Sequence, residues 1–498
     1  DARRRAPGYR GHAAVSAGLA TVAIFAALAI VYAWLPPRWR PTFLLIVSVL
    51  AIYALQPFSN LRFAAYSLQT LTILLTLATW WLTQRLVADA PPLARQDRLT
   101  LLLLLGLMLL VTSDRLLPVT VRLLPYRPPQ AGWVLLILAG TAVLSLLLAH
   151  RLRRLPYRHV LTGAMLSLVV IFVLLKWPPA ATAVATLWRS LTGEQVALAA
   201  PSDLAWLGFS YVAFRLIHTL RDRQTGLLPA CTLPEFVTYV LFFPAYTAGP
   251  IDRLERFVGD VRALDAVPTA TRWGQGGWRI AVGLFKKFVI ADSLALGLSL
   301  TAVSAQQATS IAGLWLLLYG YAFRLYFDFS GYSDIAIGLG LLFGIRLPEN
   351  FRAPYLKSNL TSFWQSWHIT LSDWARFYIF TPLSRSLLRR KPRPSNEIIL
   401  LTAHLSTMLV IGLWHGITAN FVIWGLWHGV GLFVHKQWAD RTRRWVRTLA
   451  DKPGQKQAWS LVGWFITFHY VVLGWVWFAL PTVPLAWQTL AKLMGTAV

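Results

Sequence analysis

The chain of 498 residues has little charge, few acidic residues and a single cysteine. Charged residues make up 13% of it, whereas hydrophobic residues make up 56%. Soluble proteins carry about 25% charged residues, so this composition excludes an ordinary soluble protein and indicates an integral membrane protein. Cys231 stands alone, which excludes an internal disulfide and any cysteine-based metal cluster. We interpret it as a small buried residue.

The charge that is present is unbalanced. The 47 Lys and Arg residues outnumber the 20 Asp and Glu residues, which gives a formal net charge of +27. In a chain with so many apolar runs, this excess belongs to the loops that flank membrane helices and not to a nucleic-acid interface. Dense basic clusters lie at 385–393, 436–447 and 151–158, and we expect all three on the cytoplasmic side.

Long apolar runs predict the fold class. The first extends from Ala13 to Leu35 after a basic segment, and its length of about 23 residues suits a retained membrane helix better than a signal-peptide core. The whole pattern predicts an all-α polytopic membrane protein with about 11 to 14 membrane helices, several of them short. Short or glycine-interrupted runs at membrane depth must be buried in protein or line a cavity. The runs 231–247 and 333–345 are therefore candidate walls of an internal chamber.

Ionisable and hydroxyl groups within apolar sequence gather after residue 200. We therefore expect residues 1–200 to form N-terminal transmembrane helices that act as a scaffold. Residues 201–440 are expected to form the catalytic core. Residues 441–498 would add a basic loop and a C-terminal transmembrane helix.

Two histidines lie in apolar, tryptophan-rich sequence, His368 within 363–374 and His415 within 412–429. An imidazole at membrane depth is costly, so it indicates a functional site. The segment around His368 predicts one helix with a broad aromatic face, although a place in an interfacial aromatic belt remains an alternative. His415 would lie at the turn of a hairpin formed by the two apolar runs around it, where Gly416 lets a ligand approach.

The histidines do not match the patterns of two common chemistries. A zinc site would require closely spaced ligands, such as two histidines one helical turn apart. A serine hydrolase would require a Gly-x-Ser-x-Gly segment. Neither pattern accompanies these histidines, which leaves general acid-base catalysis on a hydroxyl substrate as the predicted role.

Two segments place charges beside apolar sequence. Arg324 and Asp328 are four residues apart and would neutralise each other on one helix face. Direct contact of Asp328 with substrate is the alternative. The stretch 252–256 predicts a loop with salt bridges, and the alternative is that Arg253 and Arg256 meet an anionic donor.

Several segments stand in a distinctive order between residues 208 and 435. They are FFPAYTAGPIDR, GLFKKFVIADSLA, YFDFSGYSDIAIGLG, LPENFRAPY, FWQSWHITLSDW, and GLWHG with the following WGLWHG. Together they resemble the membrane-bound O-acyltransferase family, in its bacterial branch of alginate O-acetylases and teichoic acid D-alanyltransferases. The resemblance implies a helix bundle with short re-entrant or interfacial helices around a central funnel and tunnel.

The resemblance also implies the site residues. His415 corresponds to the catalytic histidine and His368 to the second histidine of the tunnel. The residues expected to contact substrate or line the tunnel are Asp328, Ser330, Tyr332, Asn350, Trp364, Trp367, Ser372, Trp414, Asn420 and His428. Arg253 and Arg256 would lie on the donor side.

The implied function is transfer of a small acyl group, such as acetyl or D-alanyl, to a hydroxyl of an extracytoplasmic polysaccharide or teichoic-acid-like polymer. The co-substrate would be a cytoplasmic thioester of coenzyme A or acyl carrier protein, with no bound cofactor or metal. Expected partners are membrane lipids, the donor carrier, the polymer and accessory envelope proteins, with no nucleic acid. The location would be the prokaryotic cytoplasmic membrane. A transporter or a scaffold of a polymer-export complex is the alternative, because buried ionisable residues also mark ion pathways.

Overall fold

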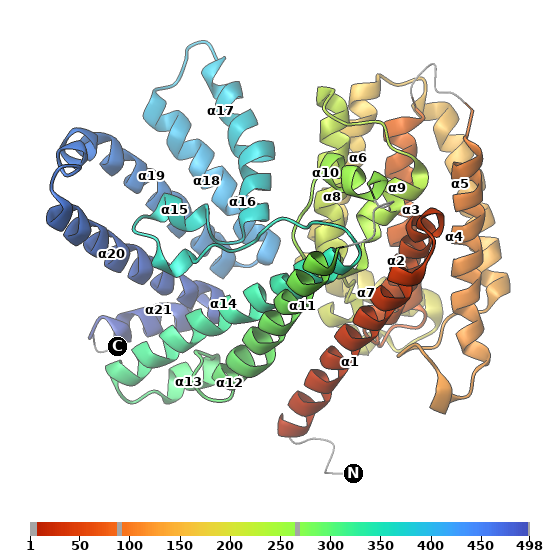
Figure 1. Ribbon diagram of the computed structural model, residues 1–498, viewed down its shortest axis with the longest axis horizontal. Helices are drawn as coiled ribbons and strands as arrows, with labels where there is room; N and C mark the ends of the chain where they lie inside the picture. The colour runs from red at the N-terminus through yellow and green to blue at the C-terminus, as the bar shows by residue number, and fades with distance from the viewer. Residues whose placement is uncertain (1–6, 87–91, 264–268, 497–498) are drawn as a thin grey trace. The chain divides into compact units, whose positions relative to one another are not determined.

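A computed structural model of the chain describes residues 7–86, 92–263 and 269–496, which are built from α-helices with short 3₁₀ and π segments (Figure 1). The chain divides into two compact units. The N-terminal unit comprises residues 1–278 and 336–347, and the C-terminal unit comprises residues 279–335 and 348–498. The functional division predicted at residues 200 and 440 stays a prediction.

The N-terminal unit contains ten helices and most of an eleventh within its described residues. They are α1 (Pro7–Trp34), α2 (Arg40–Leu55), α3 (Ala64–Gln84), α4 (Arg95–Ser113), α5 (Ala131–Leu152), α6 (Tyr157–Lys176), α7 (Pro178–Thr192), α8 (Phe209–Thr225), α9 (Leu233–Leu241), α10 (Leu254–Arg262) and α11 (Ala270–Leu284). Glycines in the left-handed conformation end α7 at Gly193 and α8 at Gly226, because glycine adopts positive φ without a side-chain clash.

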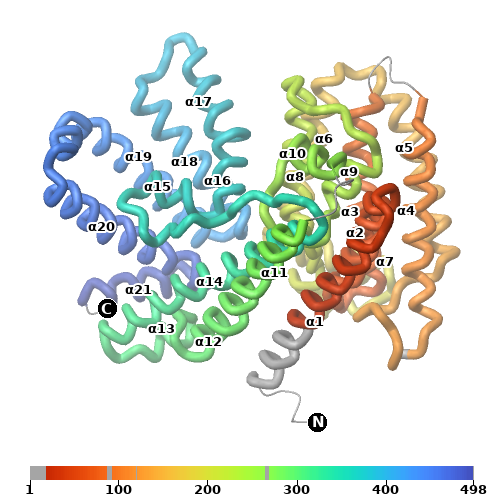
Figure 2. Tube along the Cα trace, viewed as in Figure 1, coloured from red at the N-terminus to blue at the C-terminus, as the bar shows by residue number. Residues whose placement is uncertain are grey.

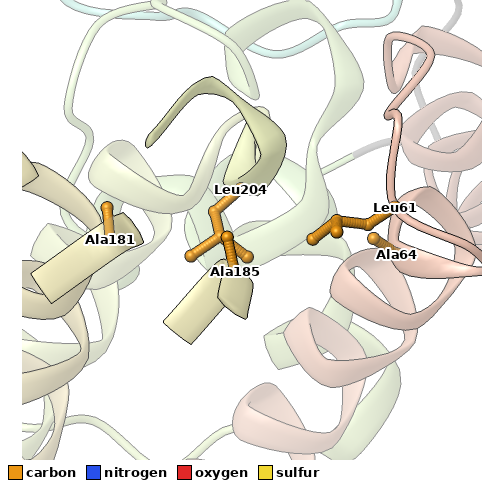
Figure 3. Packing of buried hydrophobic residues seen from close by; sticks show 5 residues of the cluster. All are labelled: Leu61, Ala64, Ala181, Ala185 and Leu204. Carbon is orange, nitrogen blue, oxygen red and sulfur yellow. The ribbon is translucent and has the colours of Figure 1, made fainter. Parts of the chain in front are cut away.

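A small cluster of buried residues joins three segments of the N-terminal unit. Leu61 comes from the connection before α3, Ala64 from the first turn of α3, Ala181 and Ala185 from α7, and Leu204 from a 3₁₀ turn after α7 (Figure 3). The alanines leave room for the two leucines between the helices. The cluster fixes the connection before α3 against α7.

The C-terminal unit contains the rest of the helices (Figure 2). They are α12 (Asp292–Ala295), α13 (Ala302–Gln307), α14 (Ile311–Leu342), α15 (Leu360–Trp364), α16 (Ile369–Ala375), α17 (Thr381–Leu388), α18 (Asn396–His415), α19 (Ala419–Thr448), α20 (Pro453–Ala479) and α21 (Val483–Leu493). Two π segments, Phe285–Ala291 and Arg376–Phe380, continue α11 and α16. The apolar runs at 309–327 and 333–345 belong mainly to one long helix, α14, whose last residues are assigned to the N-terminal unit.

Six helices of the described chain are long and apolar enough to cross a membrane: Pro37–Leu55, Arg95–Leu116, Ala131–Leu152, Tyr157–Lys176, Asn396–His415 and Pro453–Ala479. The six support a multi-pass membrane protein. They are fewer than the 11 to 14 spans expected, because a helix counts only if it is both long enough and apolar enough. Helices α14 and α19 are long but carry ionisable residues, whereas α9 is apolar but short.

The predicted hairpin after residue 396 is formed by α18 and α19, and its turn follows His415 directly. Glycines bring the two helices together. A Cβ at Gly425 would lie 2.7 Å from the carbonyl oxygen of Met408, and one at Gly429 would lie 3.0 Å from Cα of Leu405. Both distances are too short for a larger residue, so the helices meet backbone to backbone.

We expect Gly425→Ala to destabilise the protein by about 1–3 kcal/mol, because the added methyl group must displace the backbone of α18. The matched control is Gly140→Ala in α5, where a Cβ meets no atom within 4 Å. Unfolding of the purified protein in detergent measures both variants. A Gly425→Ala protein as stable as the control would contradict the close contact.

Candidate active site

His368 lies at a break between two short helices. Helix α15 ends at Trp364 and α16 begins at Ile369, so the single aromatic helix predicted for 363–374 is wrong. His368 precedes α16 with φ of 43° and ψ of 55°, in the left-handed region. That conformation is strained for a residue with a side chain and persists only where surrounding contacts enforce it.

The segment 350–352 supplies those contacts. Phe351 and Trp367 form an antiparallel β-bridge, and the Arg352 N–H donates to the Ser366 carbonyl at 3.0 Å. On the other side of His368, the Ile369 N–H donates to the Asn350 carbonyl at 2.9 Å. His368 is therefore held on both sides by one extended segment.

The Asn350 side chain strengthens this arrangement from a fully buried position. Its Oδ1 accepts a hydrogen bond from Thr370 Oγ1 at 2.7 Å, and its Nδ2 donates to Ser333 Oγ at 3.3 Å. The amide thus connects α14 to the beginning of α16. Asn350, predicted to line the tunnel, serves in the structure to position the backbone beside His368.

The His368 ring is buried, with 2% of the residue exposed, between two aromatic rings. The Phe329 ring meets it edge-on at 4.6 Å between centroids, and Trp414 lies at 5.9 Å. Its Nε2 has no hydrogen-bond partner among the described residues. Burial in an apolar environment disfavours the charged imidazolium, so the ring favours the neutral form.

His415 ends α18 on the other side of Trp414. Its ring centroid lies 4.5 Å from Trp414, 4.8 Å from Phe478 and 5.6 Å from Trp424. His415 is only half-buried, and its ring and the His368 ring both contact Trp414. The structure therefore brings the two predicted catalytic histidines together, one enclosed and one accessible.

His428 lies one layer deeper, on α19, and is fully buried. Trp424 and Trp364 contact its ring at centroid distances of 4.9 and 5.1 Å. Neither ring nitrogen has a hydrogen-bond partner in the described part of the chain. Gly474 of α20 makes room for the ring, since a Cβ there would lie 2.9 Å from Nε2 of His428.

Asp328 pairs with a different cation from the one expected. Lys287 of the π segment forms an ion pair with its carboxylate, whereas the Arg324 Nη1 donates to Ser299 Oγ at 3.3 Å. The predicted Arg324 partner is therefore wrong, because a lysine from a neighbouring helix reaches the carboxylate. The Asp328 side chain keeps 48% of its surface exposed, so it remains accessible.

A second carboxylate of α14, Asp334, is buried with its side chain 8% exposed. Lys286 Nζ and Arg279 Nη1 approach it at 2.7 and 2.8 Å. Close contact between α11 and α14 permits this, since a Cβ at Gly283 would lie 2.6 Å from the Gly331 carbonyl oxygen. The segments GLFKKF and YFDFSGYSD, far apart in sequence, are thus joined by ion pairs.

The remaining predicted site residues of the C-terminal unit have separate environments. Ser330 is buried, and its hydroxyl has no partner among the described residues. The Asn420 amide donates to the Leu480 carbonyl at 2.8 Å, which attaches α19 to the end of α20. The Ser372 hydroxyl donates to the Trp367 carbonyl at 3.2 Å, and Tyr332 is half-buried on α14.

Arg253 and Arg256 belong to the N-terminal unit. Arg253 lies 3.7 Å from the Asp222 carboxylate, and Arg256 forms an ion pair with Asp252. The salt bridges predicted for this stretch are confirmed, but only Asp252 and Arg253 lie in a loop, because α10 begins at Leu254. Their role toward a donor stays a prediction.

Residues missed at the sequence level complete the site. Phe478 and Phe329 contact the two histidines but belong to α20 and α14. No local signal marks them. Lys286 and Lys287 had such a signal, because paired lysines within an apolar run require carboxylate partners. Among the described residues, no group of three His, Cys, Asp or Glu side chains is placed to hold a metal ion.

Comparison with known proteins identifies the same family as the sequence motifs do. The membrane-bound O-acyltransferase (MBOAT) family matches residues 38–479. A teichoic acid D-alanyltransferase of Streptococcus thermophilus is 34% identical over 295 residues, which is 56% of this chain and 69% of that protein. A probable alginate O-acetylase of Pseudomonas aeruginosa is 36% identical over 283 residues, 57% of this chain and 50% of the relative.

A peptidoglycan O-acetyltransferase of Helicobacter pylori is 34% identical over 264 residues, 52% of this chain and 46% of that protein. The chain therefore aligns with about half the length of the alginate and peptidoglycan relatives.

Substitution of the two carboxylates of α14 should lower the free energy of unfolding by different amounts. We expect Asp334→Leu to cost about 3 kcal/mol, because it leaves Lys286 without its buried carboxylate, whereas Arg279 keeps the ion pair with Glu349. Asp328→Leu removes a half-exposed ion pair and should cost about 1 kcal/mol or less. Detergent unfolding curves of the two variants provide the comparison. Equal losses of stability would show that the buried pairing does not hold α11 to α14.

Proposed function

Because the chain belongs to the membrane-bound O-acyltransferase family, we propose that it transfers a small acyl group from a thioester to a polymer hydroxyl, with His415 as general base. One observation carries the assignment. A half-exposed imidazole stands at the end of a membrane helix, beside a buried imidazole held by strained backbone. An accessible base next to an enclosed polar ring suits proton transfer coupled to charge stabilisation.

The proposed reaction is a direct transfer. The neutral His415 ring accepts the proton of the acceptor hydroxyl while the oxygen attacks the thioester carbonyl. The tetrahedral intermediate then collapses, its carbon-sulfur bond breaks, and the imidazolium returns the proton to the leaving thiolate. The products are an ester and a free thiol, and the histidine regains its initial state.

His368 is assigned to the oxyanion. Its ring is neutral in its buried position, so it retains one N–H that can donate to the oxygen of the tetrahedral intermediate. The left-handed backbone and the bridge to Phe351 fix the ring before the substrate arrives. A fixed donor avoids the cost of reorienting during the reaction.

The aromatic walls have a second role in this proposal. Trp414, Trp424 and Phe478 surround His415 with apolar rings. Such walls restrict the access of water, which competes with the acceptor hydroxyl for the thioester.

The donor is proposed to be a cytoplasmic thioester of coenzyme A or acyl carrier protein. The basic segments 385–393 and 436–447 would attract either its phosphates or an acidic protein surface. The names of the relatives include alginate, teichoic acid and peptidoglycan. For this chain we propose a hydroxyl-bearing extracytoplasmic polymer as acceptor and the cytoplasmic membrane of a prokaryote as its location.

We expect His415→Ala to lower the rate of acyl transfer by about 10²–10⁴-fold, the usual contribution of a general base. His404→Ala provides the matched control, because His404 lies on the same helix but packs against Phe380. Transfer of labelled acyl groups by folded, purified protein measures both. Near-normal turnover by His415→Ala would remove His415 from the mechanism.

The donor assignment predicts that purified protein releases free thiol from a labelled thioester in proportion to the ester formed on a hydroxylated polymer. Acetyl-coenzyme A and an acyl carrier thioester are to be supplied separately. We expect one of them to support transfer, because direct attack requires an activated acyl group. Thiol release that is unchanged by the polymer would indicate hydrolysis and contradict direct transfer.

A further inference from the structure

A cationic cavity of about 310 Å³ opens in the N-terminal unit. Its lining comes mainly from the connections between helices: residues 58–63 between α2 and α3, Arg115, Tyr126 and Arg127 between α4 and α5, and Glu194 after α7. This cavity is not part of the histidine site and lies in the segment predicted to be a scaffold. Its chemistry therefore requires a separate explanation.

Arginines dominate the charge of the cavity. Arg62, Arg115 and Arg127 line it, and the positive charges of Arg127, Arg62 and Arg122 act unfavourably on Arg115. Glu194 is the one carboxylate of the lining, and it accepts hydrogen bonds from the Arg62 backbone N–H at 3.1 and 3.3 Å. Three guanidinium groups against one carboxylate leave an excess of positive charge that an anion would neutralise.

The walls are rigidly built. The Asp114 carboxylate accepts from the Leu123 N–H at 2.8 Å, and the Tyr126 hydroxyl donates to the Tyr53 carbonyl at 3.0 Å, so the arginine-bearing connection is fixed to α2. Phe63 has φ of 63°, a left-handed conformation that is costly for a bulky residue. Leu61 belongs to the buried cluster of Figure 3. Strain of this kind is typical of ligand sites.

The ends of the N-terminal helices that are remote from the cavity indicate on which side of the membrane the cavity lies. The Tyr157 hydroxyl donates to the Leu82 carbonyl at 2.9 Å, and Arg223 Nε donates to the Tyr157 hydroxyl at 3.2 Å, so the ends of α3 and α8 meet the beginning of α6. The arginines near this end are Arg85, Arg151, Arg153, Arg154, Arg158, Arg221 and Arg223. The positive-inside rule places this end in the cytoplasm.

The cavity lies at the other end of α3. The next helix of the chain after α3 belongs to the apolar span Arg95–Leu116, which ends next to the cavity residue Arg115. Its 22 residues, at 1.5 Å per residue, extend about 33 Å and match the bilayer core. The cavity arginines are therefore extracytoplasmic, where the positive-inside rule disfavours a basic cluster. An anionic ligand on that side would explain the presence of the cluster.

We propose that this cavity binds a carboxylate or phosphate group of an anionic, hydroxyl-bearing polymer on the extracytoplasmic side. Asn60 and Glu194 beside the arginines offer partners for the hydroxyl groups of such a chain. A phospholipid is less suited, because most of the lining belongs to connections and not to the membrane-facing surfaces of helices. The link to acyl transfer rests on the proposed function, whereas the anion site itself does not.

The test is equilibrium binding of the full-length protein, in nanodiscs of zwitterionic lipid and without thioester, to uronic acid oligosaccharide, polyglycerol phosphate and neutral dextran. We expect the two anionic polymers to bind and dextran not to bind. R62Q/R115Q/R127Q should weaken the binding about tenfold or more, since each charged hydrogen bond contributes about that factor. R151Q/R153Q/R154Q, with the same loss of charge at the cytoplasmic end, should bind as wild type.

Two single variants keep the test decisive if the triple variant does not fold. R115Q should weaken binding, whereas E194Q should tighten it, because it removes the opposing negative charge. Equal weakening by both triple variants, no effect of R115Q and E194Q, or binding only in nanodiscs that contain anionic phospholipid would overturn the proposal. His415→Ala should bind the polymers normally, so failure of transfer and failure of this site are separable.

Discussion

Contact between backbones in the α18–α19 hairpin is the constraint on which the site depends. Glycines at positions 412, 425 and 429 let the two helices touch without intervening side chains. Because the hairpin closes so tightly, His415 at its turn contacts Trp414 of α18 and Trp424 of α19, and Phe478 of α20 packs against the same ring. Larger residues at these glycines would separate the helices and withdraw the rings that shape the environment of His415.

Polar groups within this apolar protein are held by neighbours from distant segments. His368 keeps an unfavourable backbone conformation because residues 350–352 bond on both sides of it. Asp334 remains buried because Lys286 and Arg279 neutralise it. In each case the cost of desolvation or strain is offset by contacts between elements that the sequence separates widely. The chemistry of the site thus depends on packing between helices more than on any single helix.

Composition and motif order were sufficient to predict the membrane class, and the family and the O-acyltransferase class predicted from the motifs are confirmed. The hairpin around His415 was predictable because apolar periodicity and a glycine break are local signals. The helix break at His368 was not, because its cause is pairing with Phe351 seventeen residues before it. The ion pair between Lys287 and Asp328 was not predictable for the same reason, because the two residues are far apart in the sequence. The residues that line the arginine cavity come from three separate connections, so no single stretch of the sequence predicts it.

An experimental structure of the protein with a non-hydrolysable thioester analogue bound would test the role of the two histidines most directly. We expect the carbonyl carbon to lie beside the pair of histidines, with room for an acceptor hydroxyl within hydrogen-bond reach of His415 at about 3 Å. His368 should face the carbonyl oxygen. An analogue bound with its carbonyl away from both rings, or separated from the His415 ring by side chains, would show that the histidine pair is not the site of transfer.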